Sequence, residues 1–174
     1  IVASTDLYGG TVNLFKNTLR QQGIEVRFAD PADPKNFEKL TDDKTRAYYG
    51  ESCPNPYLRV FPIKEVADIG RPKGIPLIID NTASPVICKP LAHGAAIVMH
   101  SLTKYIGGHG TSIGGIVVDG GNFDWTKNRK RQPLLNEPDQ SYGGAVWIDA
   151  VPQLTGANIP FVIRLRVVLL RDTG

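Results

Sequence analysis

Three short apolar segments constrain the fold of this 174-residue chain more than any other feature. They are residues 76–80 (PLIID), 95–100 (AAIVMH) and 113–119 (IGGIVVD). Continuous apolar runs of this length are typical of strands that are covered on both faces of a sheet. Such strands occur in sheets with helices packed on both sides, so the chain is predicted to be an α/β protein.

The remaining segments alternate between the periods of strands and helices. Further strands are expected at residues 24–29 and 45–50, and helices at 11–22, 34–40, 62–69 and 161–171. Residues 120–140 are polar and rich in turn formers, and we expect a surface excursion there. The alternation predicts a three-layer α/β/α arrangement with a mostly parallel central sheet, in one domain of residues 1–174.

The composition argues against several classes of protein. A formal net charge of +3 is small for a nucleic-acid-binding protein, and the basic run at residues 127–131 (KNRKR) is expected to be a solvated loop. No apolar run approaches the roughly 20 residues of a membrane-spanning helix. Cys53 and Cys88 form no CxxC motif, so we expect two free thiols in the reducing cytoplasm.

Polar side chains follow the expected strands at their carboxyl ends, where open α/β sheets bind ligands. They are Glu51 and Asn55 after the strand 45–50, Asp80 at the end of 76–80, and Ser101, Thr103 and Lys104 after 95–100. Hydroxyl groups and glycine-rich turns bind phosphate, and a lysine beside them is either a phosphate partner or a Schiff-base nucleophile. A carboxylate at a strand end could hold a protonated ring nitrogen. Together these are the requirements of pyridoxal phosphate (PLP).

Other ligands fit this edge of the sheet less well. A mononucleotide loop requires GxxxxGK[ST], which is absent, and a dinucleotide fingerprint requires a third glycine where Ile113 stands. His93, His100 and His109 lack the spacing of metal ligands. Purely structural interpretations of the candidates also stay open, because Asp80 could form an Asx-turn and the two hydroxyl residues could cap the next segment.

Several motifs, found in one order along the chain, resemble the Cys/Met metabolism family of PLP-dependent enzymes. They are IVASTDLYGGTVNLF at residues 1–15, ESCPNP at 51–56, the long stretch 78–125 and the closing IRLRVVLLRDTG. Within the long stretch, HSLTKYIGGHGTSIGG followed by VVDGGNFDW is most similar to the O-acetylhomoserine sulfhydrylase branch. The resemblance implies the large domain of a fold type I PLP-dependent transferase.

The resemblance also implies roles for individual residues. Lys104 would carry the cofactor and act in catalysis, and Asp80 would pair with its ring nitrogen. Ser101 and Thr103 would bind its phosphate.

Three further residues receive roles from the same resemblance. Tyr8 would stack on the cofactor ring and take part in catalysis, although core packing is the alternative. Asn55 would approach the ring hydroxyl with Glu51 supporting it nearby, although both could be turn residues.

The activity implied is a γ-replacement on O-acetyl-L-homoserine, in which sulfide or a thiol gives homocysteine or methionine and releases acetate. A lyase of the same family, acting on cystathionine or methionine, and a non-catalytic fragment or assembly module are the alternatives. Family enzymes are longer and have an N-terminal arm and a C-terminal small domain. We therefore expect an internal part of a longer, cytoplasmic chain that assembles as a homodimer or homotetramer.

Overall fold

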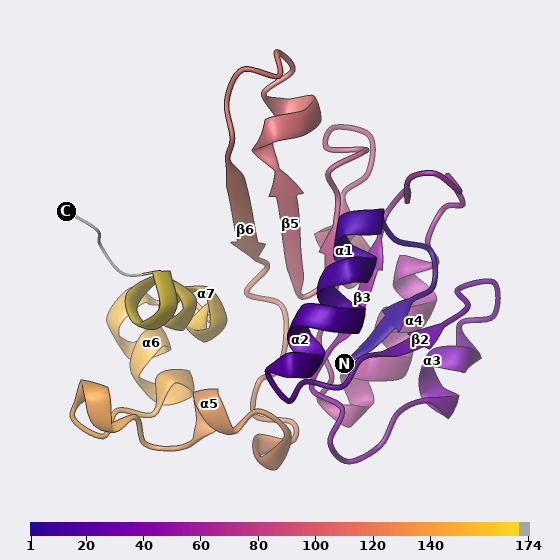
Figure 1. Cartoon of the computed structure of the whole chain (residues 1–174). Coiled ribbons are helices and arrows are strands. Elements are labelled where there is room, and N and C mark those ends of the chain that lie inside the picture. The colour runs from indigo at the N-terminus through magenta and orange to yellow at the C-terminus, as the bar shows by residue number, and fades with distance from the viewer. Residues whose placement is uncertain (171–174) are drawn as a thin grey trace.

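The computed structural model describes residues 1–170, which form a six-stranded sheet with helices on both faces (Figure 1). The strands are β1 (Val2–Ser4), β2 (Arg27–Ala29), β3 (Tyr48–Glu51), β4 (Leu77–Asp80), β5 (Ile97–Ser101) and β6 (Gly115–Asp119). Their spatial order is β2-β1-β3-β4-β5-β6. The first five strands are parallel and β6 is antiparallel to β5, which confirms the predicted mostly parallel α/β sheet.

The helices lie in the connections between strands and after β6. They are α1 (Gly9–Asn13), α2 (Leu19–Gln21), α3 (Lys35–Lys39), α4 (Ile63–Gly70), α5 (Pro133–Asn136), α6 (Trp147–Thr155) and α7 (Pro160–Arg164). A π-helical segment, Leu14–Thr18, joins α1 to α2, and another, Leu165–Leu170, continues α7. The expected helices at 11–22, 34–40 and 62–69 are thus confirmed. The helix expected at 161–171 is confirmed up to residue 170, beyond which the prediction lies outside the described residues.

All five expected strands are found with bounds that differ from the expectation, and two of these differences bear on the loops and the site. β2 begins only at Arg27, because the N–H of Ile24 still bonds to the carbonyl of Leu19 and completes the end of α2. β3 extends to Glu51, because this residue is the register partner of Asp80 in β4. Glu51 therefore belongs to the sheet itself and not to the loop that follows it.

The two faces of the sheet pack against different helices. Tyr48, Leu77 and Val98 belong to a buried cluster with Phe37 of α3 and Val66 of α4. Because side chains alternate along a strand, the next residues face the opposite side. There Tyr49, Ile78 and Met99 pack with Phe15 of the π-helical segment and Leu19 of α2. Each large apolar side chain buried in this way stabilises the folded state by on the order of 1.5–3 kcal/mol.

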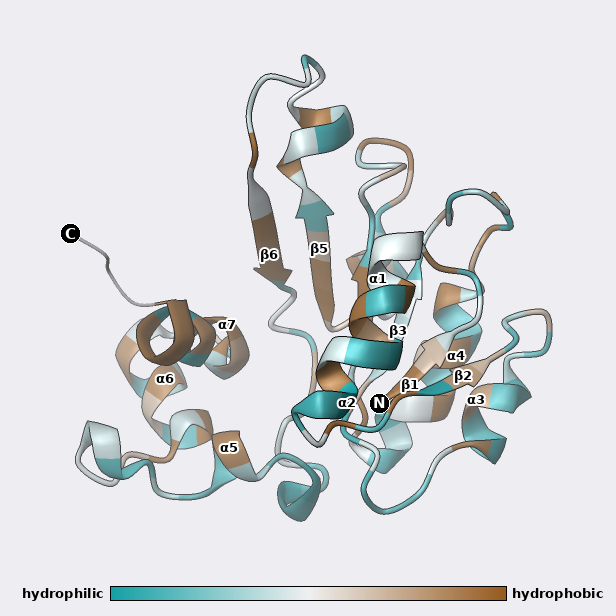
Figure 2. Ribbon diagram, viewed as in Figure 1, coloured by the Kyte–Doolittle hydropathy of each residue, from teal (hydrophilic) through white to brown (hydrophobic). Residues whose placement is uncertain are grey.

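The expectation for residues 120–140 is wrong in part. Phe123, Trp125 and Leu135 are buried and form a core with Trp147 and Val151 of α6. The exposed polar residues between them dominate the sequence pattern and conceal the aromatic anchors. Figure 1 shows α5, α6 and α7 grouped beside β6, and Figure 2 shows hydrophobic residues along β5, β6 and α7. This segment therefore extends the hydrophobic interior.

The basic run at residues 127–131 is also only partly a solvated loop. Lys127, Arg129 and Lys130 are exposed, but Arg131 is buried. Its guanidinium donates hydrogen bonds to the backbone carbonyls of Lys73, Asp42 and Thr45. Arg131 thus links this segment to the loops that precede β3 and β4.

No single helix within residues 1–170 is long and apolar enough to cross a membrane. One pair, Trp147–Thr155 with Pro160–Leu170, meets the length and composition requirements only when taken together, and it is bent by 100° at the break.

Candidate functional site

A cleft of about 740 Å³ lies at the carboxyl ends of β3, β4 and β5. Its lining includes six of the seven site residues expected from the sequence: Tyr8, Glu51, Asn55, Asp80, Ser101 and Lys104. Volumes of this size are usual for small-molecule sites. The fold therefore brings to one place residues that are spread over almost one hundred positions of the chain.

The pleat of the sheet explains why three of these side chains converge. Glu51 and Asp80 are register partners on adjacent strands. Both lie two positions after a residue of the α1-side face, Tyr49 and Ile78, so they point to the same side. Ser101 stands two positions after Met99 and continues the pattern on β5.

Asp80 is half-buried at the end of β4. Its Oδ1 accepts a hydrogen bond of 2.9 Å from the N–H of Thr82, so the Asx-turn interpretation is confirmed alongside its place in the cleft. The Thr82 hydroxyl in turn accepts a bond of 2.8 Å from the N–H of Ser101. Thr82 thus joins the ends of β4 and β5, a contribution that sequence reasoning missed.

Glu51 is a buried residue in the lining of the cleft, with 7% of its surface exposed. Its Oε1 accepts a hydrogen bond of 2.8 Å from the N–H of Tyr8, at the start of α1, and the Thr11 hydroxyl also bonds to it. Burial, together with the charge of Asp80, raises the Glu51 pKa to about 7 in spite of these two bonds. Glu51 therefore exchanges its proton near neutral pH.

Tyr8 forms one wall of the cleft. Tyr8 directly precedes α1 and is 53% exposed. An exposed ring beside a cleft is available to stack on a ligand, whereas simple core packing would have buried it. Asn55, in the loop that follows β3, also lines the cleft.

Lys104 follows β5 in a turn of π-helix, Leu102–Ile106, and its side chain is exposed. The turn departs from helical geometry at Lys104 itself, with φ −96° and ψ −118°. Thr103 is the expected site residue that is not among the cleft-lining residues. Its hydroxyl accepts a bond of 3.0 Å from the N–H of Gly114 and lies 3.3 Å from the carbonyl oxygen of the same residue, which ties this turn to the segment before β6.

The cleft also contains residues that the sequence did not single out as site residues. They are Cys53, Leu58, Thr82, Ala83, Tyr105 and Gly108. Each lies within four residues of a predicted one, so proximity in the sequence was the signal that could have found them.

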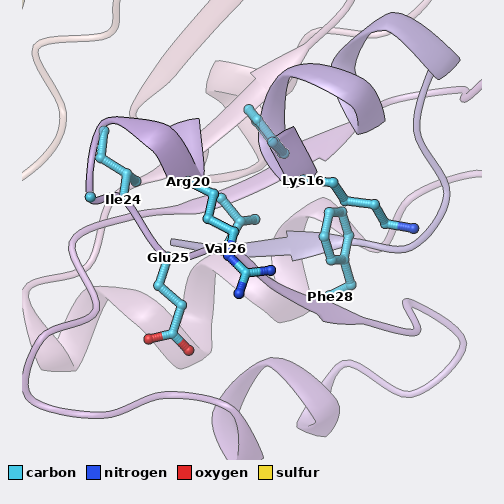
Figure 3. A pocket seen from close by; sticks show the side chains of 8 residues that line it. Lys16, Arg20, Ile24, Glu25, Val26 and Phe28 are labelled. Carbon is cyan, nitrogen blue, oxygen red and sulfur yellow. The ribbon is translucent and has the colours of Figure 1, made fainter. Parts of the chain in front are cut away.

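A smaller hollow of about 510 Å³ lies between β2 and the helical residues Leu14–Gln21 (Figure 3). Lys16 and Arg20 line it together with Glu25, and the Lys16 ammonium lies 5.4 Å from the centroid of the Phe28 ring. None of the predicted site residues borders this hollow. Among residues 1–170, no group of three or more His, Cys, Asp and Glu side chains is placed to hold a metal ion.

The donor set of the large cleft fits PLP. It combines a primary amine, a carboxyl group at a strand end, a hydroxyl and an exposed aromatic ring, which match the aldehyde, the ring nitrogen, the phosphate and the ring face of the cofactor. The fold and this cleft together define a PLP-dependent enzyme of fold type I.

The comparisons with known proteins agree with this class. The family model described as "Cys/Met metabolism PLP-dependent enzyme" matches residues 1–158, and the chain belongs to this family. The O-acetyl-L-homoserine sulfhydrylase of Leptospira meyeri is 48% identical over the whole chain, which covers 40% of that protein. The homocysteine synthase of Schizosaccharomyces pombe is 44% identical, again over the whole chain and 40% of the relative.

Solved structures show the same similarity. A proposed O-acetylhomoserine (thiol)-lyase of Campylobacter jejuni, whose structure contains a pyridoxyl-lysine phosphate residue, aligns with a TM-score of 0.86 at 36% identity. The alignment covers 99% of this chain and 42% of that one. The O-acetylhomoserine sulfhydrylase of Wolinella succinogenes aligns with a TM-score of 0.73 at 31% identity, over 95% of this chain and 42% of that one. The chain thus spans about two fifths of the length of the relatives it matches.

Proposed function

We propose that the full-length protein catalyses γ-replacement on O-acetyl-L-homoserine, in which sulfide or a thiol displaces acetate to give homocysteine or methionine. The observation that carries this proposal is that Lys104, Asp80 and Glu51 line one cleft at the edge of the sheet. The names of the relatives that align over the whole chain, O-acetyl-L-homoserine sulfhydrylase and homocysteine synthase, support the substrate.

The residues of the cleft would hold PLP as follows. The Lys104 amine would bond to its aldehyde carbon, and the Asp80 carboxylate would pair with its ring nitrogen. The Ser101 hydroxyl would donate to the phosphate, the Tyr8 ring would stack on the cofactor, and the Asn55 amide would approach the ring hydroxyl. Thr103 could join the phosphate site only if its hydroxyl turned away from the backbone of Gly114.

PLP, when bound, supplies an electron sink that lets carbon–hydrogen and carbon–oxygen bonds of the substrate break next to it. Lys104 then serves as the general base that removes the substrate α-proton with its free amine. The Asp80 carboxylate favours a positive charge at the position facing it. Glu51 holds the backbone of Tyr8 in place through its 2.8 Å hydrogen bond and thereby orients the wall on which the ring stacks.

A product assay tests this function directly. The full-length protein is incubated with PLP, O-acetyl-L-homoserine and sulfide, and separately with methionine or cystathionine alone. We expect homocysteine and acetate from the first mixture. Release of an α-keto acid from the second, with no homocysteine from the first, would contradict the replacement reaction and favour the lyase of the same family.

We also propose that the cleft is completed by other parts of the protein or by a second copy of it. Large apolar side chains are exposed in the segments that surround the cleft: Tyr57, Leu58, Val60, Val86, Ile87, Tyr105 and Ile113. Exposed apolar groups gathered in this way favour coverage by another protein surface. A homodimer or homotetramer of the full-length protein is the proposed assembly, and the cytoplasm is its proposed location, where Cys53 and Cys88 stay reduced.

A further inference from the structure

Two parts of the cleft lining, which we call its walls, come from separate connections of the fold. Tyr8 belongs to the β1–α1 connection, residues 5–8, and its ring forms one wall. Cys53, Asn55 and Leu58 belong to the β3–α4 connection, residues 52–62, and form the other. Neither connection contains a helix or strand, so the width of the cleft depends on the contacts that hold the two connections together.

Arg59 makes such a contact. It directly follows Leu58, and its Nη2 and Nε atoms lie 2.6 Å and 2.8 Å from the same oxygen, Oδ2 of Asp6. Asp6 stands two residues before Tyr8. The guanidinium therefore joins the β3–α4 connection to the β1–α1 connection, next to both walls of the cleft.

The partner of Arg59 is itself held firmly. The Asp6 side chain is only 7% exposed, its other oxygen accepts a hydrogen bond of 3.0 Å from the Thr5 hydroxyl, and its N–H donates to the Ser4 hydroxyl. Arg59 Nη2 also lies 3.0 Å from Asp30, at the end of β2. The hydrogen bond to Asp6 and the charges of Asp6 and Asp30 raise the pKa of Arg59.

Leu58, the residue before Arg59, has an unusual backbone conformation. Its φ of 55° lies in the left-handed region, which residues with a Cβ rarely adopt. A hydrogen bond of 2.7 Å from the Leu58 N–H to the Pro54 carbonyl closes the turn. The turn places Leu58 in the lining of the cleft, although its side chain is 64% exposed.

We propose that Arg59 is a positioning residue that sets the width of the cleft by pairing with Asp6, and so controls how tightly the cleft holds PLP. Arg59 does not line the cleft, and it acts through Asn55 and Leu58 on one side and Tyr8 on the other. This inference rests on the proposed function for the identity of the ligand. The geometry of the two walls does not depend on it.

The thiol of Cys53 offers a direct measurement of the wall. It lines the cleft, and its Sγ lies 3.8 Å from the Leu58 carbonyl oxygen within the same connection. Opening of the wall in cofactor-free protein therefore increases the rate at which iodoacetamide alkylates Cys53, which mass spectrometry follows site by site. Cys88 lies in the connection after β4, and no ion pair of Arg59 reaches it, so it serves as the internal reference.

The variants are made in the full-length protein. Arg59→Met retains the length of the side chain without its charge, and Arg59→Lys retains the charge without the two-atom contact. Lys64→Met is the matched control, because it breaks a surface ion pair with Asp68 on the neighbouring helix α4. We expect Arg59→Met to raise the Cys53 alkylation rate and the dissociation constant of PLP roughly fivefold each. Both values for Arg59→Lys should lie between those of Arg59→Met and the wild type. Lys64→Met should change neither the alkylation rate nor the dissociation constant.

Unchanged Cys53 alkylation and unchanged PLP affinity in the Arg59 variants would overturn the inference. If Arg59→Met does not fold, the Arg59→Lys protein decides the question in the same way. Because alkylation is measured without cofactor, it tests the role of the Arg59–Asp6 pair even in a protein that fails to bind PLP. That failure would refute the proposed function instead.

Discussion

The buried carboxyl of Glu51 makes the stability of the cofactor-free protein depend on pH. Its pKa is about 7 in the folded protein, because of burial first and the charge of Asp80 second, against an ordinary value of 4.5. The folded protein therefore keeps this proton over a pH range in which the unfolded chain has lost it. As pH rises from 4.5 to about 7, the contribution of Glu51 to the free energy of unfolding falls, and above pH 7 it stays low.

The magnitude follows from that interval. At about 1.4 kcal/mol per pH unit, the interval from 4.5 to about 7 corresponds to a loss of about 3 kcal/mol. Glu51→Gln removes the titrating group, while its amide oxygen can still accept the N–H of Tyr8. The variant should thus resemble the wild type near pH 5 and become more stable than it by about 2–3 kcal/mol at pH 8.

Urea denaturation of the two proteins without cofactor, followed by the fluorescence of the buried residues Trp125 and Trp147, measures this difference. Glu65→Gln, which changes an exposed carboxyl on α4, is the control and should show no such dependence. A stability difference between Glu51→Gln and the wild type that is the same at pH 5 and pH 8 would refute the reasoning.

Three other substitutions probe separate parts of the account. Asp80→Asn should leave PLP bound but lower kcat/KM by about 10²–10³, and an activity near that of the wild type would exclude its proposed electrostatic role. Arg131→Met leaves three backbone carbonyls without their donor, so urea unfolding should show a loss of about 2–4 kcal/mol, and a change below about 0.5 kcal/mol would mean that the carbonyls find other donors. Phe37→Ala empties part of the core between α3 and the sheet and should cost about 3–5 kcal/mol by the same measurement, with a negligible loss arguing against that packing.

The sequence predicted the sheet well because the inner strands depend on local pattern. β4 and β5 are continuous apolar runs, and few alternatives exist for such segments between turn formers. Helix α6 was not predicted, because Gly143, Gly144 and the internal Pro152 break the helical pattern. Its stability comes instead from Trp147 and Val151, which pack against aromatic residues distant in the sequence.

The candidate site was predictable to the extent that strand ends determine it. The carboxyl ends of parallel strands share one edge, so Glu51, Asp80 and Ser101 could be brought together before any coordinates were known. The direction of the Thr103 side chain could not be predicted, because it depends on where the chain returns to at Gly114. Likewise, the contact between Arg59 and Asp6 spans 53 positions and leaves no periodic signal in the sequence.

The identity of the cofactor-binding lysine is the central claim. The full-length protein is loaded with PLP, reduced with borohydride and digested, and the pyridoxyl group is located by mass spectrometry. We expect a single modified lysine, at position 104, and loss of both the modification and the visible absorbance in Lys104→Ala. A pyridoxyl group on another lysine, or full absorbance in Lys104→Ala, would contradict this claim.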